Sequence, residues 1–480
     1  MNDIKRVLIY LISILLVSLL SVEFFNFIYF ELPKEYGNIF FLLFFFLIFV
    51  LCLYVIATSY FSNATLIVFL ALAIMNILPS LTEYLRVIDR LIVVFPEIFL
   101  YFLMLLFVLN KYKFIVLDKG LIIFIILWVM ANFLSMFFAE DLVLSMPLYL
   151  LAFVAVPSFI LAINTYLSKD QFGFKKISKG IVFGYWMFVA ILCVIILSKF
   201  NSILNSYILA TGRTYPINYY GYLTPGNASF LVVLWTPFVM TFYKLNNNKL
   251  MILISFLICL LIVAADRSRG VMIVGFFYLI TYTVMRVFDT NKSIISFFKF
   301  FGVWVFFIFL IIQFDPIKNV LLYRFCDVEK DICSFSEIIK EITKSSRFPL
   351  IDLSIQSIKI NPFGVGYGSG LLYVEKYDEF WNPHNIILAQ TLSAGLMSIV
   401  AIIYIFGLTV YKAIRHKSNL SNEQKGFVNS LLLSLCGFFI YGSLTGGEFI
   451  ASTELSSLKF MTFILHIILI RYLLKVPIQD

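Results

Sequence analysis

The chain has 480 residues, of which 62% are hydrophobic and only 13% are charged, and its formal net charge is +9. Soluble domains average about 45–50% apolar and about 25% charged residues, so this composition excludes an ordinary soluble domain. A helix needs about 20 apolar residues to cross a bilayer, and such stretches recur from end to end. Basic residues mark the cytoplasmic loops of such proteins, so the positive charge does not indicate nucleic-acid binding. We predict an all-α polytopic membrane protein.

Apolar stretches separated by polar breaks predict about 14 transmembrane helices. The first follows Lys5 and Arg6 and is longer than the apolar region of a signal peptide, so we interpret it as a retained helix. The predicted helices cover approximately 7–29, 39–61, 64–81, 91–110, 120–138, 142–163, 180–199, 228–244, 249–265, 270–288, 297–314, 384–411, 427–444 and 455–474.

The distribution of basic residues predicts the orientation. With the N-terminus inside, the cytoplasmic segments carry 20 Lys and Arg residues and the short outer segments carry 8. The outer segment 315–383 holds another 8, but long loops are exempt from the positive-inside rule. We therefore expect both termini in the cytoplasm.

This map divides the chain into three parts: helices 1–11 over 1–314, a large outer loop over 315–383, and helices 12–14 over 384–480. Within the loop, SFSEIIKEITK and PLIDLSIQSIKI have helical spacing and are expected along the membrane surface. The breaker-rich turn NPFGVGYGSG follows them.

Cys326 and Cys333 also lie in this loop; a disulfide is expected if the loop faces an oxidising compartment, and two free thiols are the alternative. Four other cysteines fall within predicted helices, where they are small apolar residues (Cys52, Cys193, Cys259 and Cys436).

His384, in WNPHN, is the first candidate for chemistry. Asn382 is a suitable N-cap and Pro383 suits the first helical position, so His384 is expected in the first turn of the twelfth helix. The helix dipole there disfavours the imidazolium and leaves a neutral proton acceptor, while the free backbone N–H groups can bind an anion. The alternative is a histidine that only anchors the membrane interface.

Four outer arginines are the next candidates. Arg267 and Arg269 lie in the tight turn ADRSRG, Arg347 in SSRFPL and Arg213 in TGRTYP. The guanidinium group can hold a phosphate with two parallel hydrogen bonds. Arg269, Arg347 and His384 together would form a site for a phosphorylated lipid headgroup. A solvated surface role is the alternative for each arginine.

Tyrosines of the outer segment 200–227, among them Tyr219 and Tyr220, could stack on sugar rings or serve as interfacial aromatics.

The sequence has no phosphate-binding Walker loop, no dinucleotide glycine motif, no metal-ligand spacing and no Asp-x-Asp pair. We therefore expect no cofactor, no metal and no nucleotide-sugar donor.

Three segments taken in order resemble the bacterial O-antigen ligase/polymerase superfamily: ADRSRGVMIVGFF, SSRFPLIDLSIQSIKINPFGVGYGSG and NPHNIILAQTLSAGLMSIV. The resemblance is strongest over about 255–410. It implies a GT-C-like inner-membrane glycosyltransferase of lipopolysaccharide biosynthesis. The reaction would be inverting and metal-independent, and its donor would be a glycan on undecaprenyl pyrophosphate at the periplasmic face.

The resemblance also implies residue roles. Arg269 and Arg347 would bind the pyrophosphate, supported by Arg267, and His384 would activate or orient the acceptor hydroxyl. Preorganised cations stabilise the charge that develops on such a leaving group. Arg213, Asn385 and the two tyrosines are the further substrate-binding candidates. The implied partners are the lipid-linked oligosaccharide and membrane lipid, with a chain-length regulator protein left open, and nucleic acid is not expected.

Three functions remain open at this point. A polymerase transfers the chain to a lipid-linked repeat unit, a ligase transfers it to lipid A–core, and a flippase moves the oligosaccharide across the membrane. Helix number and the Phe/Ile/Asn/Lys-rich composition favour a polymerase. However, polymerases of this superfamily often have a Gly eleven residues after a loop Arg, whereas here Thr224 follows Arg213 and Ile358 follows Arg347 at that spacing. A flippase would need more charge within the membrane than Glu23 and Glu97 provide, and paired halves that the sequence lacks.

Overall fold

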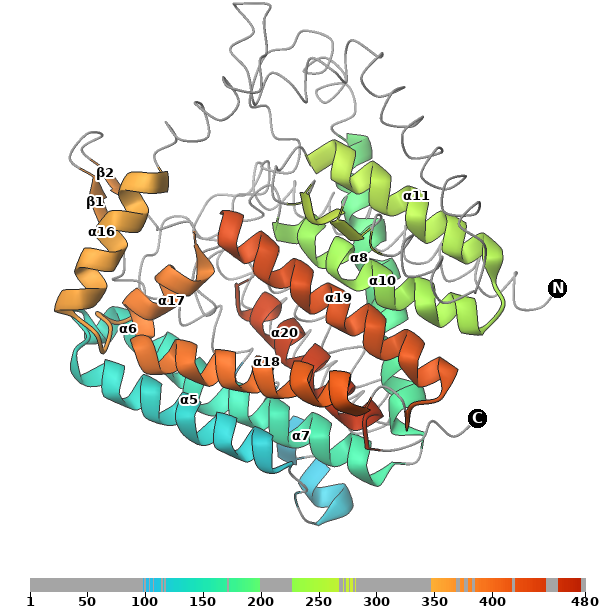
Figure 1. Ribbon diagram of the computed structural model, residues 1–480, viewed down its shortest axis with the longest axis horizontal. Helices are drawn as coiled ribbons and strands as arrows, with labels where there is room; N and C mark the ends of the chain where they lie inside the picture. The colour runs from blue at the N-terminus through green and yellow to red at the C-terminus, as the bar shows by residue number, and fades with distance from the viewer. Residues whose placement is uncertain are drawn as a thin grey trace, which may run out of the picture.

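The computed structural model of the chain is mostly helical (Figure 1). It describes residues 118–170, 172–198, 227–266, 347–367, 372–374, 379–381, 385–416, 419–445 and 456–475, with isolated residues between 98 and 115 and between 271 and 281. In chain order, its elements are α5 (Lys119–Phe137), α6 (Leu142–Leu150), the π-helical η2 (Leu151–Ala155), α7 (Val156–Lys169), α8 (Gly173–Ser198), α10 (Asn227–Leu245), α11 (Lys249–Asp266), α16 (Arg347–Ile360), β1 (Leu372–Val374), β2 (Glu379–Trp381), α17 (Ile386–Ala394), α18 (Leu396–His416), α19 (Asn422–Thr445) and α20 (Ser456–Leu473).

Four helices in this part of the chain are long and apolar enough to cross a bilayer. They cover Lys119–Phe137, Leu148–Lys169, Leu396–His416 and Asn422–Ser443. Two shorter apolar helices, Ser229–Leu245 and Lys249–Ile262, lie in the predicted helices 228–244 and 249–265. The predicted helices 7–29, 39–61, 64–81 and 297–314 lie outside the described residues, and 91–110 and 270–288 are described only in part.

Several predicted bounds were wrong. α8 begins at Gly173 rather than at 180, because Phe174 and Ile177 are buried on the inner face of a first turn whose lysines face outward. The predicted helix 384–411 is two helices, separated at Gly395, which has a φ of +79°. The antiparallel hairpin β1–β2, in which Tyr373 pairs with Phe380, was not predicted. Its three-residue strands are too short for a clear alternating pattern.

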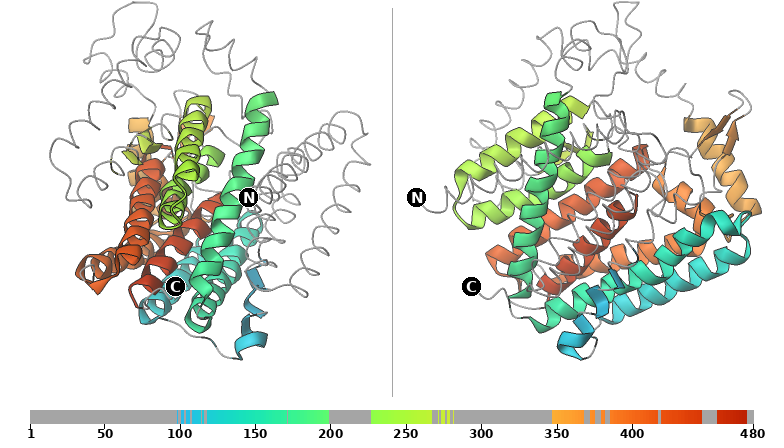
Figure 2. Two further views of the ribbon diagram at one scale, coloured as in Figure 1. Left: turned by 90° about the vertical axis from the view of Figure 1, so that its right-hand side faces the viewer. Right: turned by 180° about the vertical axis from the view of Figure 1, so that it is seen from behind.

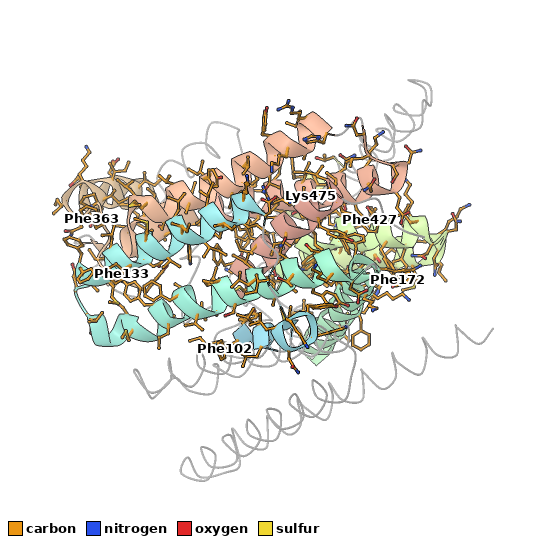
Figure 3. All side chains as sticks on the ribbon, turned by 90° about the horizontal axis from the view of Figure 1, so that it is seen from below. Phe102, Phe133, Phe172, Phe363, Phe427 and Lys475 are labelled. Carbon is orange, nitrogen blue, oxygen red and sulfur yellow. The ribbon has the colours of Figure 1, made fainter. Side chains whose placement is uncertain are left out.

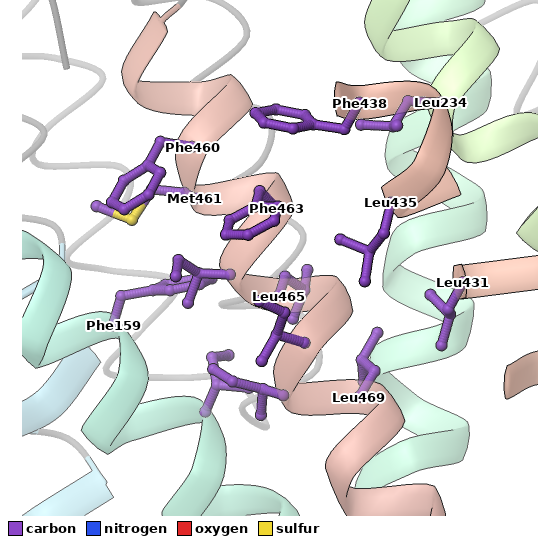
Figure 4. Close-up of a cluster of buried hydrophobic side chains, with 14 of the residues drawn as sticks. Phe159, Leu234, Leu431, Leu435, Phe438, Phe460, Met461, Phe463, Leu465 and Leu469 are labelled. Carbon is purple, nitrogen blue, oxygen red and sulfur yellow. The ribbon is translucent and has the colours of Figure 1, made fainter. Parts of the chain in front are cut away.

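α20 lies at the centre of the described bundle. Every residue from Lys459 to Arg471 is buried, and the helix contacts α7, α18 and α19. Figure 4 shows Phe463, Leu465 and Leu469 of α20 between Phe159 of α7 and Leu435 of α19. A mostly apolar helix without an exposed polar face belongs in a core, and this one is enclosed by its neighbours.

The outer faces of α5, α11 and α18 carry large exposed apolar side chains. Examples are Ile126, Leu257 and Val400, each more than half exposed. Water would disfavour such faces, whereas the hydrocarbon region of a bilayer suits them. This pattern agrees with helices that face lipid.

The described helix ends gather at two opposite ends of the bundle. The Asn385 end contains the start of α17, the end of α19 and the glycine-rich turn after α16; α16 and the hairpin lie there too (Figures 1 and 2). The Asp118 end contains the start of α5 and the ends of α18 and α20. In Figure 3, Phe133 and Phe363 lie toward the first end and Phe172 and Phe427 toward the second.

Candidate functional site

Most predicted site residues lie outside the described part of the chain. These are His384, Arg269, Arg267, Arg213, Tyr219 and Tyr220, together with the disulfide candidates Cys326 and Cys333. Arg347 is the first residue of α16, and only its backbone is described. Asn385 is described in full. Of the cysteines predicted within helices, Cys193, Cys259 and Cys436 are in helices and are free, and Cys52 lies outside the described residues.

Asn385 is the N-cap of α17. Its side-chain oxygen accepts hydrogen bonds from the N–H groups of Ile387 at 3.0 Å and Leu388 at 3.2 Å. The prediction of Asn382 as the cap was therefore wrong, because α17 begins at Ile386 and His384 precedes the cap instead of lying in the first turn. The carboxamide oxygen of Asn385 therefore stabilises the start of α17. Its amide nitrogen also approaches the carbonyl oxygen of Ser443, 3.5 Å away at the end of α19.

Two glycines from different sequence motifs meet backbone to backbone. A Cβ atom on Gly364 would lie 2.7 Å from the nitrogen of Gly395, and one on Gly395 would lie 2.6 Å from the carbonyl carbon of Phe363. Both glycines have positive φ, +88° and +79°, which side chains disfavour. The glycines of NPFG and LSAG are therefore needed because the chain crosses itself here.

Backbone hydrogen bonds extend this crossing. The N–H of Val365 donates to the carbonyl oxygen of Leu392 at 2.7 Å, and the N–H of Leu396 donates to that of Pro362 at 2.9 Å. On the other side of the turn, the N–H of Glu140 donates to the carbonyl oxygen of Val365. The predicted breaker-rich turn is confirmed, and it is inserted between the α5–α6 corner and the α17–α18 break.

A buried polar network secures the same turn. The hydroxyl of Tyr367 donates to Asn132 Oδ1 of α5 at 2.6 Å and accepts from Gln390 Nε2 of α17 at 3.1 Å. All three residues are fully buried. Asn132 also donates to the carbonyl oxygen of Trp128 in its own helix. Such groups must be paired in a dry interior, so the network fixes the position of α17 relative to α5.

α16 confirms the helix predicted over PLIDLSIQSIKI. Leu350 packs against Leu392 of α17, and Ser354 on the same face is buried, while Ile355 and Ile360 on other faces are exposed. The helix packs on the bundle, and its exposed apolar residues face outward. Arg347 therefore begins a helix that contacts α17, whose cap directly follows His384 in sequence.

Lys459, one of the outer basic residues, also lies at the Asn385 end but was not predicted as a site residue. It lies in the first turn of α20, is only 6% exposed, and its Nζ is 5.9 Å from the ring centroid of Tyr441. Tyr441 in turn stacks on Phe230 at the start of α10. A lysine at the outer end of a predicted helix was a sequence signal that could have identified this residue, because basic residues are unexpected there.

Within the described residues, no group of three His, Cys, Asp or Glu side chains is placed to hold a metal ion. Comparison with known proteins gives no match: no protein-family model, curated protein or solved structure is similar to the chain.

Proposed function

We propose that the chain is a membrane-embedded glycosyltransferase, an O-antigen or polysaccharide polymerase. It would transfer a glycan from undecaprenyl pyrophosphate onto a lipid-linked repeat unit at the periplasmic face, with inversion and without a metal. The active site would contain His384, Arg347 and Arg269 at the Asn385 end, with Arg267, Arg213, Asn385, Tyr219 and Tyr220 contributing to substrate binding.

The observation that carries the proposal is the contact between two of the resembling motifs. Gly364 and Gly395 touch through their backbones, and Val365 hydrogen-bonds to Leu392. The motif that opens with Arg347 and the motif that opens with His384 thus belong to one packed unit. A crossing held by backbone contacts provides a rigid base, which a catalytic constellation requires.

The third resembling motif, ADRSRGVMIVGFF, begins in the last turn of α11. The turn at 246–248 joins α10 and α11 into an antiparallel pair, and Phe230 of α10 stacks on Tyr441 of α19, whose last turn meets Asn385. The last residue of α11, Asp266, directly precedes Arg267. These contacts favour a common site for the three motifs.

In the proposed mechanism, His384 removes the proton of the acceptor hydroxyl as its oxygen attacks the anomeric carbon. The bond from that carbon to the pyrophosphate oxygen breaks, and Arg347 and Arg269 stabilise the negative charge that the leaving group gains. Fixed guanidinium groups perform this role without a metal ion.

The decisive experiment replaces His384 and Arg347 by Ala in a strain deleted for the native gene. We expect loss of chain growth by at least about 100-fold, as for removal of a general base or of charge stabilisation. Lipopolysaccharide gels would then show core plus one repeat unit. Core alone in both variants would indicate the ligase instead. His416→Ala and Arg415→Ala, at the end of α18, are matched controls and should give normal ladders.

A purified assay separates the enzyme from a flippase. The protein in detergent, supplied with undecaprenyl-pyrophosphate-linked repeat units and a metal chelator, should lengthen the glycan. No lengthening by a folded protein, or normal ladders from both active-site variants, would contradict the proposal.

A further inference from the structure

Three cations surround one buried carboxylate at the Asp118 end. Asp118, the N-cap of α5, forms ion pairs with Arg471 at the end of α20 and with Lys475 just beyond it. Lys412 of α18 lies 4.0 Å from the same carboxylate. These four residues form the Asp118 cluster, in which Asp118 and Arg471 are 353 residues apart in the sequence.

The Asp118 cluster carries more positive than negative charge. Three cations face one carboxylate, and helix ends contribute about +0.5 at the start of α5 and about −0.5 each at the ends of α18 and α20. A net charge of about +1.5 remains. Burial, followed by the charge of Arg471, lowers the pKa of Lys475, as expected where cations crowd together.

Arg471 has hydrogen-bonding capacity left over. The residue is 3% exposed, and among the described residues its Nε and Nη1 atoms have no hydrogen-bond partner. Leaving buried charged donors unpaired costs more than an ordinary missing hydrogen bond. Neutralising the C-terminal ends of α18 and α20 would account for the charges of Lys412 and Lys475. It would not provide hydrogen-bond acceptors for the guanidinium group of Arg471.

The Asp118 cluster is open to the outside on its lysine side. The side chain of Lys412 is 35% exposed and that of Lys475 is 52% exposed. Apolar side chains nearby in α5 and α18 are also exposed, among them Ile122 and Ile414. A ligand there would meet cations at one point and apolar surface beside them.

We propose that the Asp118 cluster binds the phosphate of a monoanionic lipid headgroup. A phosphodiester has one negative charge, close to the excess that the cluster carries, and its oxygens can accept from the exposed ammonium groups of Lys412 and Lys475. The exposed apolar side chains favour a lipid over free phosphate, and basic pockets at the cytoplasmic side of helix bundles are suited to such headgroups. This site is at the opposite end of the bundle from Asn385 and does not depend on the proposed glycosyl transfer.

The test measures lipid binding to the full-length protein in detergent by native mass spectrometry. Phosphatidylglycerol should bind, and phosphatidylcholine, which has no net charge, should bind more weakly. Lys412→Gln combined with Lys475→Gln should weaken phosphatidylglycerol binding about 30-fold, from about 1 kcal/mol for each lysine near a lipid surface. Lys475→Gln alone should weaken it about 5-fold and is the milder variant if the double variant does not fold.

Lys175→Gln combined with Lys179→Gln is the matched control, because both lysines are exposed on the first turns of α8 and lie outside the cluster. It should bind phosphatidylglycerol like the native protein. Adding excess inorganic phosphate distinguishes a lipid headgroup from free phosphate. If phosphate alone binds, with the same dependence on Lys412 and Lys475, free phosphate is the ligand. Equal binding of both lipids, or equal effects of the two double variants, would overturn the site.

Discussion

The two ends of the bundle are held together by different forces. At the Asn385 end, the backbone crosses at Gly364 and Gly395, and neutral hydrogen bonds join the turn to its neighbours. At the Asp118 end, charged side chains from three helices converge on one carboxylate. The first end is thus held by backbone contacts and uncharged side chains, whereas at the second end charged side chains make the contacts.

The largest expected effect comes from Asp118→Asn. The variant keeps an oxygen that can accept from Gly120 N, a bond of 2.8 Å in the native protein, and removes only the charge. Breaking a buried pair costs about 3–5 kcal/mol, because Arg471 would remain buried without its partner. Thermal unfolding in detergent measures the loss. Adding Arg471→Met should recover much of it, and no recovery would mean that charge is not what holds this end.

Gly395→Ala should cost at least about 2 kcal/mol, because its positive φ strains any side chain and the new Cβ would meet the backbone of Phe363. Gly407→Ala is the matched control, since no atom outside its own helix lies within 4 Å of the added Cβ. That variant should be neutral or more stable by up to about 1 kcal/mol. Equal unfolding midpoints for the two variants would refute the crossing as a structural requirement.

Tyr367→Phe should have a smaller effect, about 1 kcal/mol, from two buried hydrogen bonds of about 0.6 kcal/mol each. The change removes the donor to Asn132 Oδ1 and the acceptor for Gln390. Tyr411→Phe removes an exposed hydroxyl that accepts from Arg415, and unfolding should be unchanged. If the Tyr367 variant is as stable as this control, the network does not position α17.

The smallest effect is expected at Asp170, after α7. Burial raises the pKa of its carboxyl, but hydrogen bonds from Lys176 and from the N–H of Phe172, with the charge of Lys176, outweigh this and leave the pKa below its ordinary value. The stabilisation is therefore complete above about pH 4 and is lost as the pH falls through the lowered pKa.

Because Lys176 is one-third exposed, Asp170→Asn should cost no more than about 1 kcal/mol at pH 7. Unfolding midpoints measured from pH 7 to pH 3 should fall less steeply for this variant than for the native protein. If the unfolding midpoints of the two proteins fall in parallel, the Asp170–Lys176 pair does not contribute to stability.

Apolar length and helix-breaking residues predicted most of the described helices, and the glycine-rich turn was predicted from composition alone. The sequence did not reveal that Gly364 faces Gly395, or that Asp118 meets Arg471, because neither pairing leaves a local pattern. Asn382 and Asn385 are equally good caps by residue type, so residue type alone could not identify Asn385 as the cap. Of the candidate site, only the scaffold around Arg347 and Asn385 is described; the roles of His384 and the other arginines stay predictions.

The central position of α20 has a consequence for biogenesis. Residues 456–473 are made after all the other described helices, yet they fill the space between α7, α18 and α19. Until that segment leaves the ribosome, Phe159 of α7 and Leu435 of α19 lack the α20 side chains that lie beside them in Figure 4. Lys459, His466 and Arg471 make the segment poorly suited to lipid on its own, so its burial depends on the helices that were made before it.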